Sequence, residues 1–226
     1  MRFDLEQIDP AVVYKLLVAT VVPRPIAWVT TINRQGLVNA APYSFFNVMG
    51  PAPPTLVLGL MADAQRGFKD TARNIMESGE FVVNLVPHAL VQAMNITAVD
   101  APADISELEL AGLEQAACTH VRPPRIAISP VSFECLNHAA IVTGPHQTIV
   151  VGRIVAIHVA DGYVRDAQRG HIDTPGLDLV ARTFGAGYVR TRDTFDLVRP
   201  TWADWQASHA EPGRAPQPQS CTGETR

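Results

Sequence analysis

The chain has 226 residues, of which 47% are hydrophobic and 18% are charged, so it can bury a core and wholesale disorder is excluded. Its net charge is −4 without a basic cluster, which argues against nucleic-acid binding, because that binding depends on Lys and Arg that neutralise phosphates. The cysteines at 118, 135 and 221 are odd in number and widely spaced, so we expect no disulfide framework and a cytoplasmic location. We expect neither a signal peptide nor a membrane span, because the N-terminus is acidic and no apolar run approaches ~20 residues.

A helix and a β-hairpin are predicted first along the chain. Asp9 and Pro10 are typical of a helix start, and apolar residues then recur on one face as far as Ala19. Residues 26–32 are β-branched and aromatic, which predicts a strand. A turn that closes on glycine joins this strand to residues 37–41, and the pair predicts a hairpin.

The segment from 43 to 86 mixes strand and helix signals. Three strands are predicted, at 43–49, 55–61 and 80–86. A short helix from 69 to 78, ended by Gly79, separates the second strand from the third. Phe81, Val83 and Leu85 should share one face of the third strand.

The second half of the chain predicts two helical pieces and two long strands. The helical pieces lie at 89–99 and 102–113, and the strands at 131–143 and 147–159, the latter dense enough in β-branched residues for an inner strand. About six or seven strands with inserted helices favour an antiparallel barrel over a parallel doubly wound sheet. We expect one mainly β domain over 1–205, followed by a disordered tail at 206–226 that is rich in Ser, Pro and Gln.

Residues 22–75 carry three kinds of group that suit a flat, polar-edged heterocycle with a phosphate tail. Strands with threonine hydroxyls come first, and residues 44–47, Ser-Phe-Phe-Asn, then combine flat apolar surface with amide groups. Lys69 comes just before a helix start, where free N–H groups and the helix dipole favour an anion. The alternatives are core packing by the two phenylalanines and ordinary helix capping beside a solvated lysine. Near a phosphate, Asp70 should point away or pair with Lys69 or Arg73.

Strand alternation limits which side chains of the first strand can reach a ligand. Trp28 and Thr30 should lie on one face, with Ala27, Val29 and Thr31 on the other, so at most one set lines the ligand.

Cationic and glycine-rich positions extend this candidate site. Arg24 is a candidate contact for a phosphate or a partner subunit, with a surface salt bridge as the alternative. Late in the chain, Gly185 and Gly187 would let the backbone approach a ligand, Arg190 would add a cation and Tyr188 an aromatic edge, unless the segment is an ordinary glycine turn.

Two cysteine–histidine pairs invite a zinc interpretation. Cys118-x-His120 and Cys135-x-x-His138 lack the tight paired spacing of structural zinc sites, so we predict no metal. The sequence has no Walker loop, nucleophile elbow or dinucleotide glycine fingerprint. A nicotinamide would therefore serve as a substrate and not as a cofactor held on a Rossmann domain.

Four sequence blocks resemble the flavin reductase-like family. They are PRPIAWVTT (23–31), APYSFFN (41–47), KDTARNI (69–75) and the late GAGYVR (185–190). The resemblance spans roughly residues 10–195 and implies an FMN-binding, Greek-key split β-barrel. Carried over position by position, it implies that the flavin is bound by Arg24, Thr30, Thr31, Ser44, Asn47, Lys69, Thr71, Asn74, Tyr188 and Arg190.

The same resemblance implies a function and partners. We expect an FMN-dependent oxidoreductase that passes hydride from NADH or NADPH to flavin or to a downstream acceptor. The resemblance also implies a homodimer with the flavin near the subunit interface, and a monooxygenase partner that would receive the reduced flavin. The chain lacks the family's usual late histidine-containing nicotinamide segment and carries an extra helical stretch at 89–113. The alternatives are therefore a flavin-holding electron carrier without its own NAD(P)H site, or a flavin-free interaction module.

Overall fold

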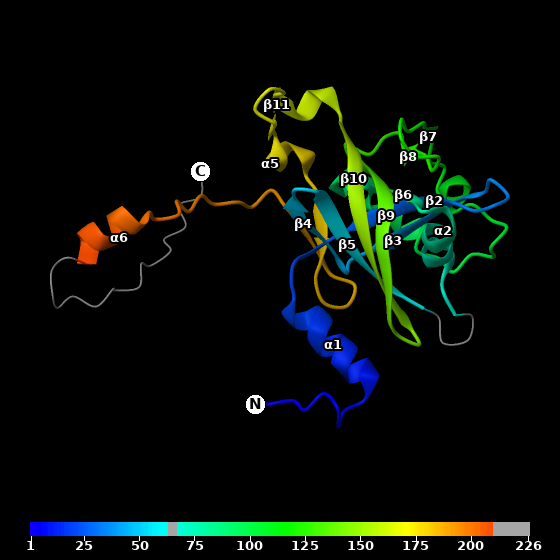
Figure 1. Cartoon of the computed structure of the whole chain (residues 1–226), viewed down its shortest axis with the longest axis horizontal. Coiled ribbons are helices and arrows are strands. Elements are labelled where there is room, and N and C mark those ends of the chain that lie inside the picture. The colour runs from blue at the N-terminus through cyan, green and yellow to red at the C-terminus, as the bar shows by residue number, and fades with distance from the viewer. Residues whose placement is uncertain (63–66, 210–226) are drawn as a thin grey trace. The chain divides into compact units, whose positions relative to one another are not determined.

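A computed structural model describes residues 1–62 and 67–209 of the chain (Figure 1). The chain divides into two compact units, Met1–Asp193 and Thr194–Arg226. In the second unit, helix α6 (Trp202–His209) stacks the rings of Trp202 and Trp205 with their centroids 4.9 Å apart. The tail expected at 206–226 overlaps this helix at 206–209, and its remainder lies outside the described residues.

A seven-stranded sheet, antiparallel at every pairing, forms the first unit. Its strands in spatial order are β3 (Val38–Tyr43), β2 (Ala27–Ile32), β6 (Glu80–Asn84), β9 (Val131–Gly144), β10 (Gln147–Val159), β5 (Pro54–Met61) and β4 (Phe46–Pro51). The predicted antiparallel, mainly β architecture is confirmed, and so is the inner position of the 147–159 strand, because β10 pairs with both β9 and β5.

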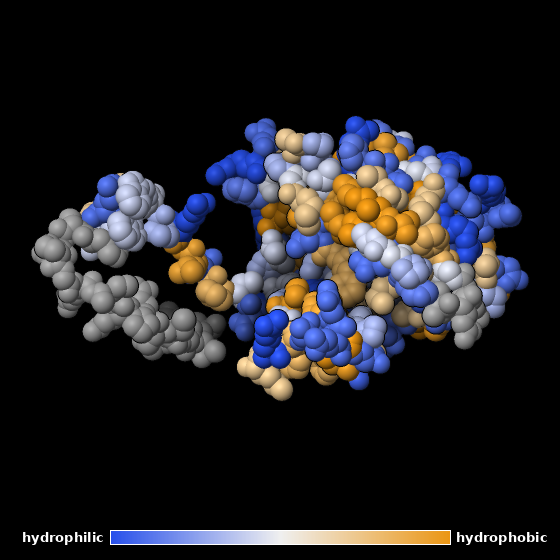
Figure 2. All heavy atoms as spheres, turned by 60° about the horizontal axis from the view of Figure 1, so that its bottom comes forward, coloured by the Kyte–Doolittle hydropathy of each residue, from blue (hydrophilic) through white to orange (hydrophobic). Residues whose placement is uncertain are grey.

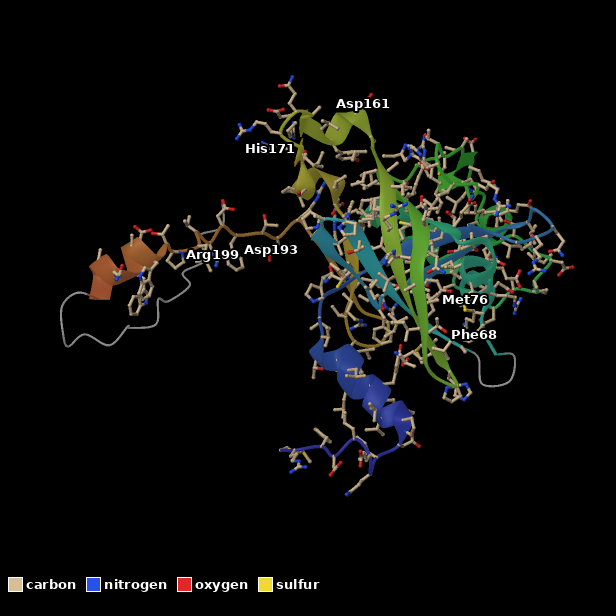
Figure 3. All side chains as sticks on the ribbon, viewed as in Figure 1. Phe68, Met76, Asp161, His171, Asp193 and Arg199 are labelled. Atoms are coloured by element: carbon tan, nitrogen blue, oxygen red, sulfur yellow. The ribbon has the colours of Figure 1, made fainter. Side chains whose placement is uncertain are left out.

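Short strands make the remaining pairings. They are β1 (Arg24–Pro25), β13 (Val180–Arg182) and β14 (Tyr188–Arg190) in one small sheet, β7 (Gln115–Ala116) with β8 (Arg125–Ile126), and β11 (Val164–Asp166) with β12 (His171–Ile172). Asp161 and His171 mark the excursion that carries β11 and β12 (Figure 3).

Helices occupy the connections between strands. They are α1 (Pro10–Thr20), α2 (Asp70–Ser78), the 3-10 turn η1 (His88–Leu90), α3 (Val91–Ile96), α4 (Glu107–Leu110), η2 (Asp161–Tyr163) and α5 (Thr174–Leu177). Gly79 ends α2 in the left-handed conformation, as predicted. The piece predicted over 102–113 shortens to α4, because Gly112 at φ +63° closes it. Within the described ranges, no helix has the length and apolarity needed to cross a bilayer.

The predicted hairpin is the pair β2–β3, and one side chain organises its turn. The Asn33 carboxamide oxygen accepts the backbone N–H groups of Gln35 and Leu37, both at 2.9 Å. Gly36 follows at φ +85°, a conformation that glycine adopts without strain. The hairpin thus holds its register from Ala27 opposite Tyr43 to Ile32 opposite Val38.

Two hydrophobic clusters lie on the two faces of the sheet, and β2 contributes to both. Ala27 and Val29 pack with Phe81 in one cluster, whereas Trp28 packs with Met94 in the other. The predicted alternation along β2 is therefore confirmed. In the first cluster β10 needs a glycine at 152, because a Cβ there would lie 2.5 Å from Cζ of Phe81.

Helix α1 begins as the sequence predicts, but several of its apolar side chains are exposed to solvent. The Asp9 carboxylate accepts the N–H of Ala11 at 2.7 Å, and Val18 is the buried residue of the helix. Tyr14 and Leu17 are each 47% exposed. In Figure 1 the helix stands away from the sheet.

Candidate functional site

The start of α2 carries the cation that the sequence singled out. Lys69 is the N-cap residue in extended conformation, and its side chain makes no capping hydrogen bond within the described part of the chain. Its Nζ instead lies 3.0 Å from a carboxylate oxygen of Asp100. Asp70, in the first turn, pairs with Arg73 at 2.7 Å, which confirms one of the two arrangements expected for it. The ammonium of Lys69 therefore faces the loop after α3 and not its neighbour Asp70.

Two polar pairs, one buried and one partly buried, fix α2 against the hairpin. The Asn74 amide donates to the Thr31 hydroxyl at 3.0 Å, and the Asn39 amide donates to the Thr71 hydroxyl at 2.9 Å. Thr31, Thr71 and Asn74 are each at most 5% exposed. Figure 1 shows α2 beside β3, so these pairs hold the start of the helix at the edge of the sheet.

A hollow of about 430 Å³ opens between the hairpin, the start of α2 and the loop after α3. Its lining residues are Asn39, Ala41, Pro42, Tyr43, Gly67, Phe68, Lys69, Asp70, Thr71, Arg73, Thr97, Ala98, Val99, Asp100, Ala101, Pro102, Ala103 and Glu107. We call it the lysine hollow. It presents a lysine, a helix N-terminus and the flat faces of a proline and a tyrosine together.

A second hollow, of about 220 Å³, adjoins the first. The two share Pro42, Tyr43 and Ala98, and Ser44 and Tyr188 line the second. A third hollow of about 490 Å³ shares Tyr188 with the second and extends along β14. Three sequence blocks far apart in the chain are thereby brought to a row of three adjoining hollows, which we call the groove.

Two ionisable groups with raised pKa values, Glu107 and Tyr43, also line the lysine hollow. A Glu107 carboxylate oxygen accepts the N–H of Ala40 at 3.0 Å, and the residue is 7% exposed. Burial raises the pKa of Glu107, although the hydrogen bond from Ala40 opposes the rise. Burial likewise raises the pKa of Tyr43 to about 12, against a side-chain hydrogen bond with Thr71. Burial thus makes ionisation of both groups less favourable than it is in water.

At the far end of the groove, arginines are held by local partners. Arg182 donates to the Tyr188 hydroxyl at 2.7 Å and lies 4.6 Å from the centre of its ring. Arg190 makes two hydrogen bonds to Asp178, which lower the pKa of that carboxyl. Arg190 lines the third hollow, and Tyr188 lines both the second and the third.

Five of the predicted contact residues line none of these three hollows: Arg24, Thr30, Thr31, Asn47 and Asn74. Thr31 and Asn74 are bonded to each other. Arg24 is 5% exposed and donates to the backbone oxygens of Val18, Val21 and Thr183, so it joins the end of α1 to the late loop. Thr30 donates to the Pro124 oxygen at 2.5 Å on the opposite face of β2.

Asn47 lies on β4, an exposed edge strand, and its side chain accepts the N–H of Val48 at 2.8 Å. It thus faces outward from the described part of the chain.

Sequence reasoning missed the acidic partners of the hollow. Asp100 lies 31 residues from Lys69, and Glu107 lies 67 residues from Ala40. Both follow α3 in a segment whose pattern indicates only helical pieces. Asn39 was detectable, because it falls within the hairpin that precedes the Ser-Phe-Phe-Asn block.

Comparison with known proteins relates the chain to one protein family. Residues 19–177 match the sequence model of the flavin reductase like domain. A protein of Deinococcus radiodurans is 41% identical over 211 residues, which cover 91% of this chain and 92% of that protein.

Two solved structures share the fold closely. Nitrilotriacetate monooxygenase component B from Bacillus cereus is 33% identical with a TM-score of 0.83, covering 87% of this chain and 98% of its own. The 2-nitrobenzoate 2-nitroreductase NbaA of Pseudomonas fluorescens is 33% identical with a TM-score of 0.81, covering 89% and 98%.

Proposed function

Since the chain belongs to the flavin reductase-like family and has its split-barrel fold, we propose that it is an FMN-dependent oxidoreductase that passes hydride from NADH or NADPH to flavin or to a downstream acceptor. The observation that carries the proposal is the position of Lys69, at a helix start and at the mouth of a groove that runs on past Ser44 to Tyr188. Bound flavin supplies the redox chemistry, and the chain supplies binding and orientation.

The phosphate end of the ligand belongs at the start of α2. A helix N-terminus offers backbone N–H donors and a favourable dipole, and Lys69 adds a full positive charge. Thr71 contributes a first-turn N–H, while its hydroxyl is already engaged by Asn39. Asp100 holds Lys69 in a pair that is exposed on both sides, so a phosphate can replace it at little cost.

The ring end belongs in the second hollow. Pro42 and Tyr43 give flat apolar surface, and Ser44 gives polar groups for a ring edge. Thr31 and Asn74 are bonded to each other beneath the site, so their proposed role is to position α2 and the hairpin. Tyr188, steadied by Arg182, closes the groove, and Arg190 supplies positive charge beyond it.

We propose further that the chain acts as a homodimer with the flavin near the subunit interface. Apolar residues are exposed on α1 and on the edge strand β4, where Leu17 is 47% and Val48 56% exposed. Figure 2, which turns the α1 end forward, shows hydrophobic surface among hydrophilic residues there. Asn47 on the same strand would then reach the flavin from the partner.

Sedimentation of two variants tests the dimer. Leu17→Asp and Val48→Asp should each convert dimers to monomers, because a buried unpaired carboxylate is costly at an apolar interface. Ile128→Asp, at a site 61% exposed between β8 and β9, is the matched control and should leave the mass unchanged. A wild-type protein that sediments as a monomer would contradict the proposal.

The donor and acceptor are tested by one assay. Oxidation of NADH and of NADPH is followed at the nicotinamide absorbance, with and without added FMN. The proposal expects oxidation of at least one donor when FMN is present. The likeness to a monooxygenase component B supports a monooxygenase as the consumer of the reduced flavin. Flavin binding without oxidation of either donor would identify an electron carrier instead, and no flavin binding would leave an interaction module.

A further inference from the structure

A second cluster of reactive side chains lies outside the groove, where three segments of the chain meet. Cys118 comes from the loop between β7 and β8, Glu134 from β9 and His158 from β10. Their ligating atoms, a sulfur, a carboxylate oxygen and an imidazole nitrogen, all lie within 4.8 Å of one another. None of the three lines the lysine hollow or its two neighbours.

Glu134 is the centre of this cluster, and the backbone fixes its orientation. The carboxylate is fully buried, and its two oxygens accept the N–H groups of Thr119 at 2.9 Å and His120 at 2.6 Å. Nε2 of His158 lies 2.6 Å from Oε1. Ligating carboxylates are commonly held in this way by outer hydrogen bonds, which leave one oxygen directed at the ion.

The cluster is open to ions from one side. The His158 side chain is 30% exposed and Cys118 is half-buried, whereas Glu134 lies beneath them. The strand register explains the meeting, because Ala156 pairs with Glu134 and places His158 diagonally across from it. A dissolved cation would thus meet the thiol and the imidazole first.

We propose that Cys118, Glu134 and His158 bind a divalent transition-metal ion, with Zn²⁺ the ion that best fits this donor set. A thiolate and a carboxylate together balance the charge of the cation, and the imidazole completes a three-ligand set. Three protein ligands leave a fourth position of a tetrahedral ion for water or another small ligand.

The geometry needs only small movements to accept the ion. Metal–ligand bonds of about 2.0–2.3 Å place tetrahedral donor atoms roughly 3.3–3.8 Å apart. The contact between His158 and Glu134, now a hydrogen bond at 2.6 Å, would open as the ion takes its place. Cys118 would close in from at most 4.8 Å, on a loop that Glu134 already anchors through Thr119 and His120.

Cobalt(II) is the probe, because a thiolate bound to it gives a charge-transfer band in the near ultraviolet. Metal-free full-length protein is titrated with Co²⁺, and each spectrum is recorded against the same protein without cobalt so that bound flavin cancels. The expected result is one Co²⁺ per chain with a charge-transfer band, displaced by one equivalent of Zn²⁺. Cys118→Ser should abolish the band, and His158→Ala should weaken Co²⁺ binding by at least about tenfold.

Matched variants separate ligation from general damage. Cys221→Ser keeps Cys118, and His138→Ala removes an exposed histidine from the strand that carries Glu134, so both should bind Co²⁺ like the wild type. Lys69→Ala should also bind it normally, because the two sites are separate. If circular dichroism shows that Cys118→Ser does not fold, the Co²⁺ affinity of His158→Ala alone tests the site. Absence of a thiolate band in the wild type, or equal binding by wild type and the two ligand variants, would overturn the site and leave a carboxylate network that only anchors the loop.

Discussion

Nζ of Lys69 lies 3.0 Å from Oδ1 of Asp100, across the mouth of the lysine hollow. The two side chains are 46% and 76% exposed, so the pair contributes only about 0–1 kcal/mol to stability. Its effect is on the availability of the lysine. A phosphate that binds at the start of α2 must take Lys69 from Asp100 and must also approach a nearby negative charge.

Removing that competitor should tighten phosphate binding. Asp100→Asn is expected to lower the Kd for FMN several-fold and to leave the Kd for riboflavin, which has no phosphate, unchanged. Fluorescence titration with both ligands measures this. Asp104→Asn, an exposed acid four residues later, is the control and should change neither. Equal effects of Asp100→Asn on the two flavins would show that Asp100 does not act through the phosphate.

Glu107 should make the wild type lose stability as the pH rises. The pKa of Glu107 is raised in the folded state, so the unfolded chain releases this proton at a lower pH than the folded chain does. The contribution of protonated Glu107 to the free energy of unfolding is therefore full below the ordinary pKa of 4.5. It is lost as the pH rises through the raised pKa of the folded state. Glu107→Gln cannot titrate and keeps an acceptor for the N–H of Ala40. In urea unfolding from pH 4 to 7, the free energy of unfolding of the variant should therefore increase relative to that of the wild type as the pH increases. A constant difference across this range would contradict the shifted pKa.

The pair Asn74–Thr31 should hold α2 on the sheet. Asn74→Ala leaves the buried Thr31 hydroxyl without its donor, which is expected to cost roughly 1–3 kcal/mol of unfolding free energy. A double-mutant cycle with Thr31→Val measures the coupling between the two side chains. If the two losses simply add, the hydrogen bond contributes nothing and the position of α2 is set by apolar packing alone.

The local elements of this fold follow from the sequence because each is determined by neighbouring residues. Glycine at 36 and 79 sets a turn and a helix end, and alternation along β2 separates Trp28 from Ala27 and Val29. Lysine before a predicted helix, together with the family resemblance, pointed to the start of α2 as a candidate anion site, which stays a prediction.

Partners that are distant in the chain could not be predicted in the same way. No pattern relates Lys69 to Asp100, or Ala40 to Glu107, because tertiary packing alone brings them together. Arg24 shows the same limit: its sequence context suits a phosphate contact, but the end of α1 surrounds it with carbonyl oxygens. The Cys118, Glu134 and His158 cluster combines a loop and two strands, so Cys–His spacing gave no indication of it.

The central claim is that Lys69 at the start of α2 holds the phosphate of a flavin. Lys15, exposed on α1, is the other lysine of the chain and gives a matched control. The decisive measurement is the Kd for FMN and for riboflavin in the wild type, Lys69→Ala and Lys15→Ala.

A charge-assisted contact of about 1.5–3 kcal/mol predicts that Lys69→Ala weakens FMN binding roughly 10- to 150-fold, while its riboflavin binding and both affinities of Lys15→Ala stay at the wild-type values. An unchanged FMN affinity in Lys69→Ala, or an equal loss for FMN and riboflavin, would contradict the claim.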